Sequence, residues 1–141
     1  MKKIILILIL MLVFTLLPIR AQYYNGGRYN SLESPTSATM TFRNDSQYNM
    51  TLKIIGIYKG LHSVVSLPAY SSRIVSFTNS ATYKLKIKAV NGRHVSYHNA
   101  GNFSVTCTKT KISQGQMIFK MSTYGSGLGP SISAKEFESN K

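Results

Sequence analysis

The histidines are the side chains of this 141-residue sequence that titrate near neutral pH and bind metals. His94 and His98 stand four positions apart, which on a helix would place both rings on one face and indicate a metal pair. Asn91 and Gly92, just before them, are instead a strong hairpin signal. On a strand the two histidines lie about 13 Å apart, too far to share one zinc ion. We therefore expect solvent-exposed loop histidines and no metal site.

Nucleophilic catalysis would need Cys107 or a serine beside a histidine that a third group orients. The sequence contains no G-x-S-x-G elbow, and the run GSGLG at 125–129 lacks the Lys-Ser/Thr pair and the helix of a phosphate-binding loop. No Asp or Glu occurs between Asp45 and Glu136, which excludes paired-carboxylate chemistry from the body of the chain. The sequence thus predicts a protein that is not an enzyme and has no cofactor, with a hydrolase as a distant alternative.

Cys107 is the only cysteine, so no intramolecular disulfide can form. It follows Phe103 and Val105 at alternate positions, as expected on the apolar side of a strand. We interpret Cys107 as a small buried hydrophobic residue.

Basic residues are the most distinctive feature, since the chain has 17 Lys and Arg against 4 Asp and Glu. Between residues 83 and 89, lysines alternate with apolar residues, which predicts an exposed ladder of ammonium groups with stems about 6.6 Å apart. Further cations occupy the polar positions of other predicted strands. The candidate polyanion-binding residues are Lys84, Lys86, Lys88, Arg43, Lys53 and Lys120.

Such a surface suits an acidic polysaccharide, lipopolysaccharide phosphates, anionic lipid headgroups or extracellular nucleic acid, although no specific nucleic-acid motif is present. Exposed lysines also keep sheets soluble and protect their edges from pairing, which is the alternative explanation. The shortage of acidic residues favours binding, because a purely solubilising surface mixes both signs.

These residues are expected to lie on strands, because apolar residues recur along the chain with a period of two. The expected strands cover residues 38–43, 50–55, 65–67, 75–77, 83–89, 93–98, 103–108 and 117–122. Seven or eight short strands with regular turn signals predict an all-β fold, a single antiparallel β-sandwich of immunoglobulin-like architecture, with a small β-barrel as the alternative. The cysteine pair and the Trp of true immunoglobulin domains are absent.

The chain begins like an exported protein. Lys2 and Lys3 precede an apolar run at 4–17, which is shorter than the roughly 20 residues of a transmembrane helix. Residues 1–21 therefore predict a signal peptide cleaved after Ala21, with an uncleaved anchor as the alternative. This segment resembles the leaders of bacterial exported proteins. The expected destination is the periplasm, the cell surface or the medium.

The remaining organisation follows from composition. We expect a flexible Tyr/Asn/Gly/Ser leader at 22–37, the strand domain at 38–123, and a C-terminal loop and frayed tail at 124–141. The resulting hypothesis is an exported, non-enzymatic module that binds an anionic surface or polymer through its basic strand face. The alternative is a protein-interaction or structural module that assembles by sheet-edge pairing.

Overall fold

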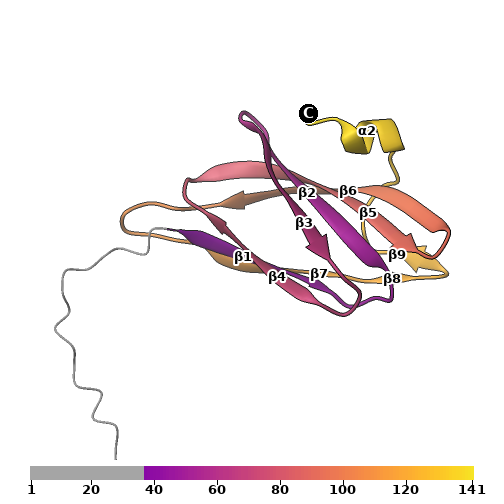
Figure 1. The fold of residues 1–141 in the computed structure, drawn as a ribbon. Coiled ribbons are helices and arrows are strands. Elements are labelled where there is room, and N and C mark those ends of the chain that lie inside the picture. The colour runs from indigo at the N-terminus through magenta and orange to yellow at the C-terminus, as the bar shows by residue number, and fades with distance from the viewer. Residues whose placement is uncertain (1–36) are drawn as a thin grey trace, which may run out of the picture. The chain divides into compact units, whose positions relative to one another are not determined.

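The computed structural model describes residues 37–141. The predicted signal peptide and residues 22–36 of the predicted leader lie outside the described residues. Figure 1 shows that strands dominate the described part and that a short helix follows them. The elements are β1 (Ala38–Asn44), β2 (Asn49–Gly56), β3 (Gly60–Leu67), β4 (Ser72–Phe77), β5 (Ala81–Asn91), β6 (His94–Val105), β7 (Gln114–Phe119), β8 (Met121–Ser122), β9 (Gly125–Ser126) and α2 (Ala134–Glu138).

The seven long strands form two sheets, which confirms the all-β prediction. Sheet A has the order β4-β1-β7, and sheet B has the order β3-β2-β5-β6. Neither sheet closes into a barrel. All pairs are antiparallel except β1 with β7, which is parallel and departs from the expected antiparallel arrangement.

The strand order does not confirm the immunoglobulin-like architecture. If the seven long strands are lettered A to G along the chain, they pair here as D-A-G and C-B-E-F. The immunoglobulin constant-type order is A-B-E-D and C-F-G. Short strands with alternating apolar residues are common to many topologies, so periodicity alone did not distinguish between these orders.

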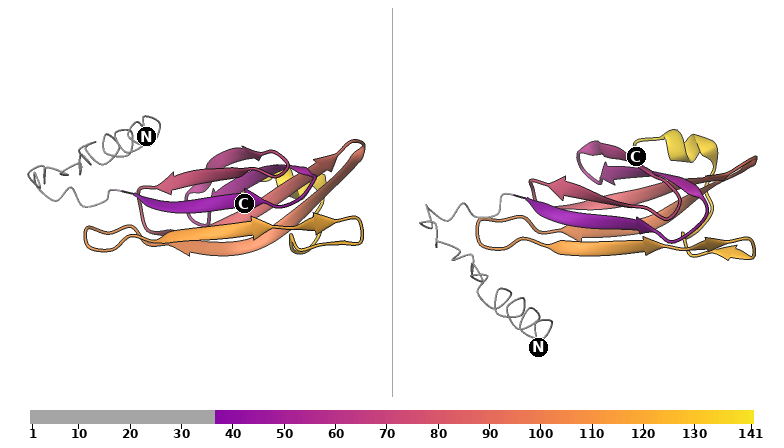
Figure 2. Two further views of the ribbon diagram at one scale, coloured as in Figure 1. Left: turned by 90° about the horizontal axis from the view of Figure 1, so that it is seen from below. Right: turned by 60° about the horizontal axis from the view of Figure 1, so that its bottom comes forward.

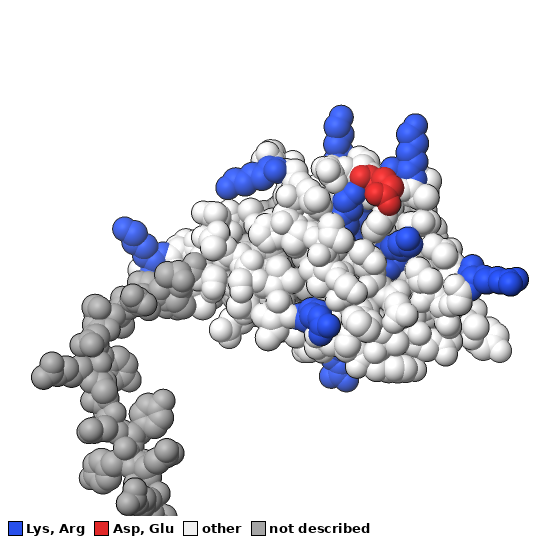
Figure 3. Space-filling view, in the orientation of Figure 1, with Lys and Arg blue, Asp and Glu red and all other residues white. Residues whose placement is uncertain are grey.

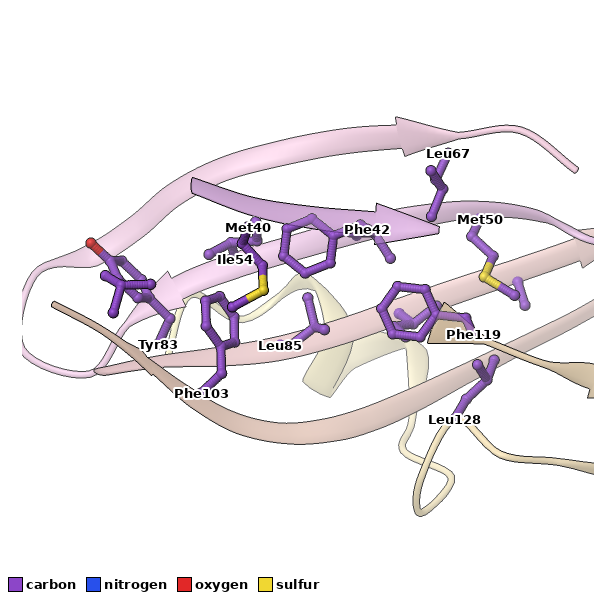
Figure 4. Close-up of a cluster of buried hydrophobic side chains, with 14 of the residues drawn as sticks. Met40, Phe42, Met50, Ile54, Leu67, Tyr83, Leu85, Phe103, Phe119 and Leu128 are labelled. Carbon is purple, nitrogen blue, oxygen red and sulfur yellow. The ribbon is translucent and has the colours of Figure 1, made fainter. Parts of the chain in front are cut away.

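The two sheets face each other across one hydrophobic core (Figure 2). Figure 4 shows how side chains from both sheets meet there. Phe42 of β1 packs edge-to-face on Phe103 of β6, with ring centroids 5.9 Å apart, and stacks on Phe119 of β7 at 6.2 Å. Leu85 and Ile87 of β5 are fully buried in the same core. Because side chains alternate along a strand, the lysines between them point to the outer face of sheet B.

The hairpin between β5 and β6 has longer strands than expected, and its turn is shifted by one residue. Asn91 pairs with His94, so the turn is centred on Gly92 and Arg93, one residue later than predicted. Of these two, Gly92 alone has a positive φ, 60°, which is the type II′ pattern rather than type I′. The two strands predicted at 93–98 and 103–108 are one strand, β6, interrupted by a bulge opposite β5 near Gly101, whose φ is 85°.

A buried polar corner joins the two sheets at the end of β1. The side-chain amide of Asn44 donates to the carbonyls of Tyr48 at 2.7 Å, Leu67 at 3.2 Å and Pro68 at 3.0 Å. Its Oδ1 accepts from the backbone N–H and the hydroxyl of Ser46. Asn44 is fully buried, so these bonds satisfy groups that water does not reach.

Candidate anion-binding face

The lysine ladder lies on the outer face of sheet B, as the alternation predicts. In the pairing of β2 with β5, Lys53 stands directly opposite Lys86. Lys88 stands opposite Thr51, and Lys84 stands opposite Ile55. The structure therefore brings four of the six predicted cations together: Lys53, Lys84, Lys86 and Lys88.

The expectation that the whole ladder is exposed is wrong. Lys86 is only 1% exposed and Lys53 only 6%, while Lys84 and Lys88 are half-buried. The covering element is the C-terminal segment, which we expected to be a frayed tail. Figure 1 shows that it forms α2 on the outer side of sheet B.

Short-range and long-range contacts together hold α2 in place. At its start, the Ser133 hydroxyl accepts a hydrogen bond from the Glu136 N–H at 3.0 Å. At its centre, Phe137 is buried with its ring 5.4 Å from that of Tyr97 on β6. A five-residue helix is not stable alone, so docking on sheet B is what maintains it.

The two buried lysines donate to the carbonyl oxygens at the end of this helix. The Lys53 ammonium donates to the carbonyls of Phe137 at 3.1 Å and Glu138 at 2.6 Å. The Lys86 ammonium donates to the carbonyls of Glu136 and Ser139. A helix C-terminus carries partial negative charge and unpaired carbonyls, so it is a suitable partner for two cations that face each other across a strand pair.

The surroundings of Lys86 lower the pKa of its ammonium group. Burial lowers the pKa of its ammonium below the usual 10.5, and the neighbouring charge of Lys84 lowers it further. Glu136 acts in the opposite direction and raises the pKa, while Lys53 contributes a smaller decrease. The charged form of Lys86 is therefore less favourable here than in the unfolded chain.

The remaining cations of this face surround α2. Lys88 lies over the ring of Tyr97 at 5.9 Å from its centroid. One hollow of about 500 Å³, lined by Lys53, Lys88 and Glu138 among others, opens beside the helix. Another of about 560 Å³ is lined by Lys84 and Lys141 together with Asn102 and Asn140. Figure 3 shows Lys and Arg side chains projecting along the margin where α2 lies, with acidic atoms beside them.

Two of the six predicted anion-binding residues do not lie on the outer face of sheet B. Arg43 belongs to β1 of sheet A, where its Nε is bonded to the Asp45 carboxylate at 2.6 Å. Lys120 is exposed between β7 and β8. The alternation placed both on the polar side of a strand, but it did not indicate to which sheet that strand belongs.

The histidines of β6 also differ from the prediction that they are exposed in loops. His94 and His98 both lie on β6, and His98 is buried rather than exposed in a loop. Its Nδ1 lies 3.1 Å from the Gly129 carbonyl and its Nε2 lies 3.0 Å from the Ser96 hydroxyl. A carbonyl only accepts, so Nδ1 carries the proton and the ring links β6 to the C-terminal segment.

Cys107 is half-buried, lies just beyond β6 and packs against the core, so it is less enclosed than expected. Within residues 37–141, no three His, Cys, Asp or Glu side chains gather as a metal site. In the same range, no helix has the length and apolar character needed to cross a membrane.

Sequence reasoning missed α2, although a signal was present. Ser133 and Glu136 have the spacing of a helix-capping pair, and Phe137 gives the segment one apolar anchor. Comparison with models of known protein families, with curated proteins and with solved structures finds no match to this chain.

Proposed function

We propose that this chain is an exported, non-enzymatic β-sandwich module that binds an anionic polymer or surface through the outer face of sheet B. The observation that carries the proposal is the unequal charge of the two outer faces. The outer face of sheet B carries four adjacent lysines on β2 and β5, of which Lys84 and Lys88 reach the surface and Lys53 and Lys86 lie under α2. At the outward positions of sheet A the described strands carry one cation, Arg43, which is already bonded to Asp45.

Lys84 and Lys88 are the ladder residues best placed to contact the ligand, because the ammonium groups of Lys53 and Lys86 are bonded to α2. Lys135 and Lys141 are exposed on the C-terminal segment, where the exposed carboxylates of Glu136 and Glu138 offset their charge. An acidic glycan, lipopolysaccharide or nucleic acid would be held by charge and without base or sugar readout, so its binding should depend steeply on salt.

The test is retention on heparin with a matched control. We expect the double substitution Lys84→Ser and Lys88→Ser to elute at clearly lower salt than the wild type. The control, Lys109→Ser with Lys111→Ser, removes the same charge from the exposed turn before β7. With DNA as the probe, the affinity of the Lys84→Ser, Lys88→Ser variant should fall less steeply with salt, by the amount expected for the loss of about two phosphate contacts. Equal loss in both variants would mean that net charge alone drives retention and would refute the proposed face.

A protein-interaction module is the second candidate, and the exposed edge strands favour it. Ile74 on the edge strand β4 is 70% exposed, and Val64 on the edge strand β3 is 56% exposed. Apolar edges pair with added strands. Salt-insensitive self-association that Ile74→Lys abolishes would support this function instead.

A further inference from the structure

An apolar cavity of about 520 Å³ opens at one end of sheet B. Its walls come from the β2–β3 turn, the start of β5 and the end of β6. Its volume falls within the range of about 300–1,000 Å³ typical of small-molecule sites. Tyr58, Leu61, Tyr83 and Val105 are among its lining residues.

Packed aromatic rings form one wall of this cavity. The His62 ring stacks on Phe77 with centroids 4.8 Å apart and lies 5.1 Å from the ring of Tyr83. Tyr83 is 6% exposed, and burial raises the pKa of its phenol, which indicates surroundings of low polarity. The wall is therefore preformed and aromatic, with Tyr83 buried and His62 exposed at its edge.

The mouth of the cavity exposes apolar surface on one turn. Tyr58 is 96% exposed, and Ile57 and Leu61 are 45% and 44% exposed. Exposed apolar residues that cluster around a cavity mark a binding site more often than single ones do.

Three hydroxyls that line the cavity bond to the protein itself. The hydroxyls of Thr82 and Ser104 bond to each other at 2.8 Å. The Ser80 hydroxyl donates to the Cys107 carbonyl and accepts from the Cys107 N–H. These three hydroxyls need no polar ligand atoms, so the part of the cavity near Leu61, Tyr83 and Val105 suits a hydrocarbon chain.

The charge around the turn is positive. Lys59 lines the cavity itself, and Lys84 and Lys141 line the hollow on the other side of the same turn. The two spaces share Gly56, Ile57, Tyr58 and Gly60. No acidic residue lines either of them. An apolar interior with a cationic rim complements a ligand that joins a hydrocarbon chain to an acidic head.

We propose that this cavity binds a single-chain anionic amphiphile, with the chain against Leu61, Tyr83 and Val105 and the acidic head at Lys59. This site adjoins the lysine face, since Lys84 lies across the shared turn and Leu61 also lines the hollow beside Lys53 and Lys88, but the proposal does not depend on polyanion binding. A fatty acid and an alkyl phosphate share the chemistry that the cavity recognises, a single hydrocarbon chain with an anionic head.

The direct test is calorimetric titration with alkanoates and alkyl phosphates of increasing length, kept below the concentration at which they form micelles. Because each buried methylene raises affinity about fourfold, binding should strengthen with length until the cavity is full. Decanoate should bind more tightly than decanol, which has the same chain and no charge. Chain-length-independent binding, or no binding, would overturn the proposal.

Variants locate the two parts of the ligand. Lys59→Ser should weaken decanoate about tenfold and leave decanol unchanged, whereas Leu61→Gln should weaken both. Lys109→Ser and Ile74→Ser are the matched controls, exposed residues outside the cavity that should change neither.

Chemical-shift mapping on the wild type tests the site without any substitution that affects folding. The shifts should concentrate at residues 56–62, 80–83 and 104–105. Shifts centred on Lys53 and Lys88 instead would overturn the cavity assignment. Binding to anionic phospholipid vesicles without binding of monomeric decanoate would also overturn it and would identify the exposed turn as a bilayer contact.

Discussion

Replacing Phe137 by Ala should uncover the buried lysine pair without unfolding the two sheets. Phe137 is 5% exposed, and its ring lies 5.4 Å from Tyr97 and 5.6 Å from the Lys53 ammonium. Burying a Phe side chain contributes about 1.5–3 kcal/mol. The ring pair adds about 0.5–1.5 kcal/mol. A loss of about 3 kcal/mol raises the fraction of chains with α2 detached roughly 100-fold.

Acetylation of lysines, followed by peptide mass spectrometry, measures this opening. Lys86 is buried and reacts only when α2 detaches, so its labelling rate should rise roughly 100-fold in Phe137→Ala, in proportion to the opening equilibrium. Lys109 is exposed and serves as the internal reference. Tyr124→Ala removes an aromatic ring that is 99% exposed and should leave the rate unchanged.

Two results would contradict a role for Phe137 as the anchor of α2. An unchanged Lys86 rate in a folded Phe137→Ala variant would mean that α2 does not depend on its aromatic anchor. A parallel rise in amide exchange at Leu85, in the core of β5, would mean that α2 unfolds only together with the sheets.

Three further outcomes follow from the same contacts. A chain ending at Ser133 should bind heparin at higher salt than the full chain, because it frees the ammonium groups of Lys53 and Lys86; weaker retention would contradict this. Since the pKa of Lys86 is lowered, the unfolded chain binds more protons at this group between that pKa and 10.5, so the contribution of Lys86 to stability should rise with pH across this window, while Tyr83, whose pKa is raised from 10.0, acts in the opposite direction. Urea titrations at several pH values should show that Lys86→Met lacks this contribution. A pH dependence of stability identical to that of the wild type would contradict the prediction. Asn44→Ala should lower the free energy of unfolding by about 2–4 kcal/mol, because it leaves buried carbonyls unpaired. Thermal denaturation measures this loss, and an unchanged stability would disprove the prediction.

Local patterns predicted the strands well where one face is buried. The alternation from Tyr83 to Ala89 corresponds to β5, with its apolar residues in the core and its lysines outward. Asn91 and Gly92 correctly predicted the hairpin, although the turn is centred one residue later. Local periodicity did not predict that β6 continues through Gly101, because a bulge interrupts the alternation there without ending the strand.

An all-β fold, a strongly basic charge and a shortage of acidic residues could all be predicted before the structure, because they depend on composition and on neighbouring positions. The strand order and the exposure of each lysine could not, because they depend on contacts between distant segments. Lys86 is buried by residues 50 and 53 positions further along the chain, and Arg43 is separated from the ladder because β1 belongs to the other sheet. Periodicity specifies the side of a strand that a residue faces. What covers that side depends on distant segments, here a five-residue helix that exists only because it docks.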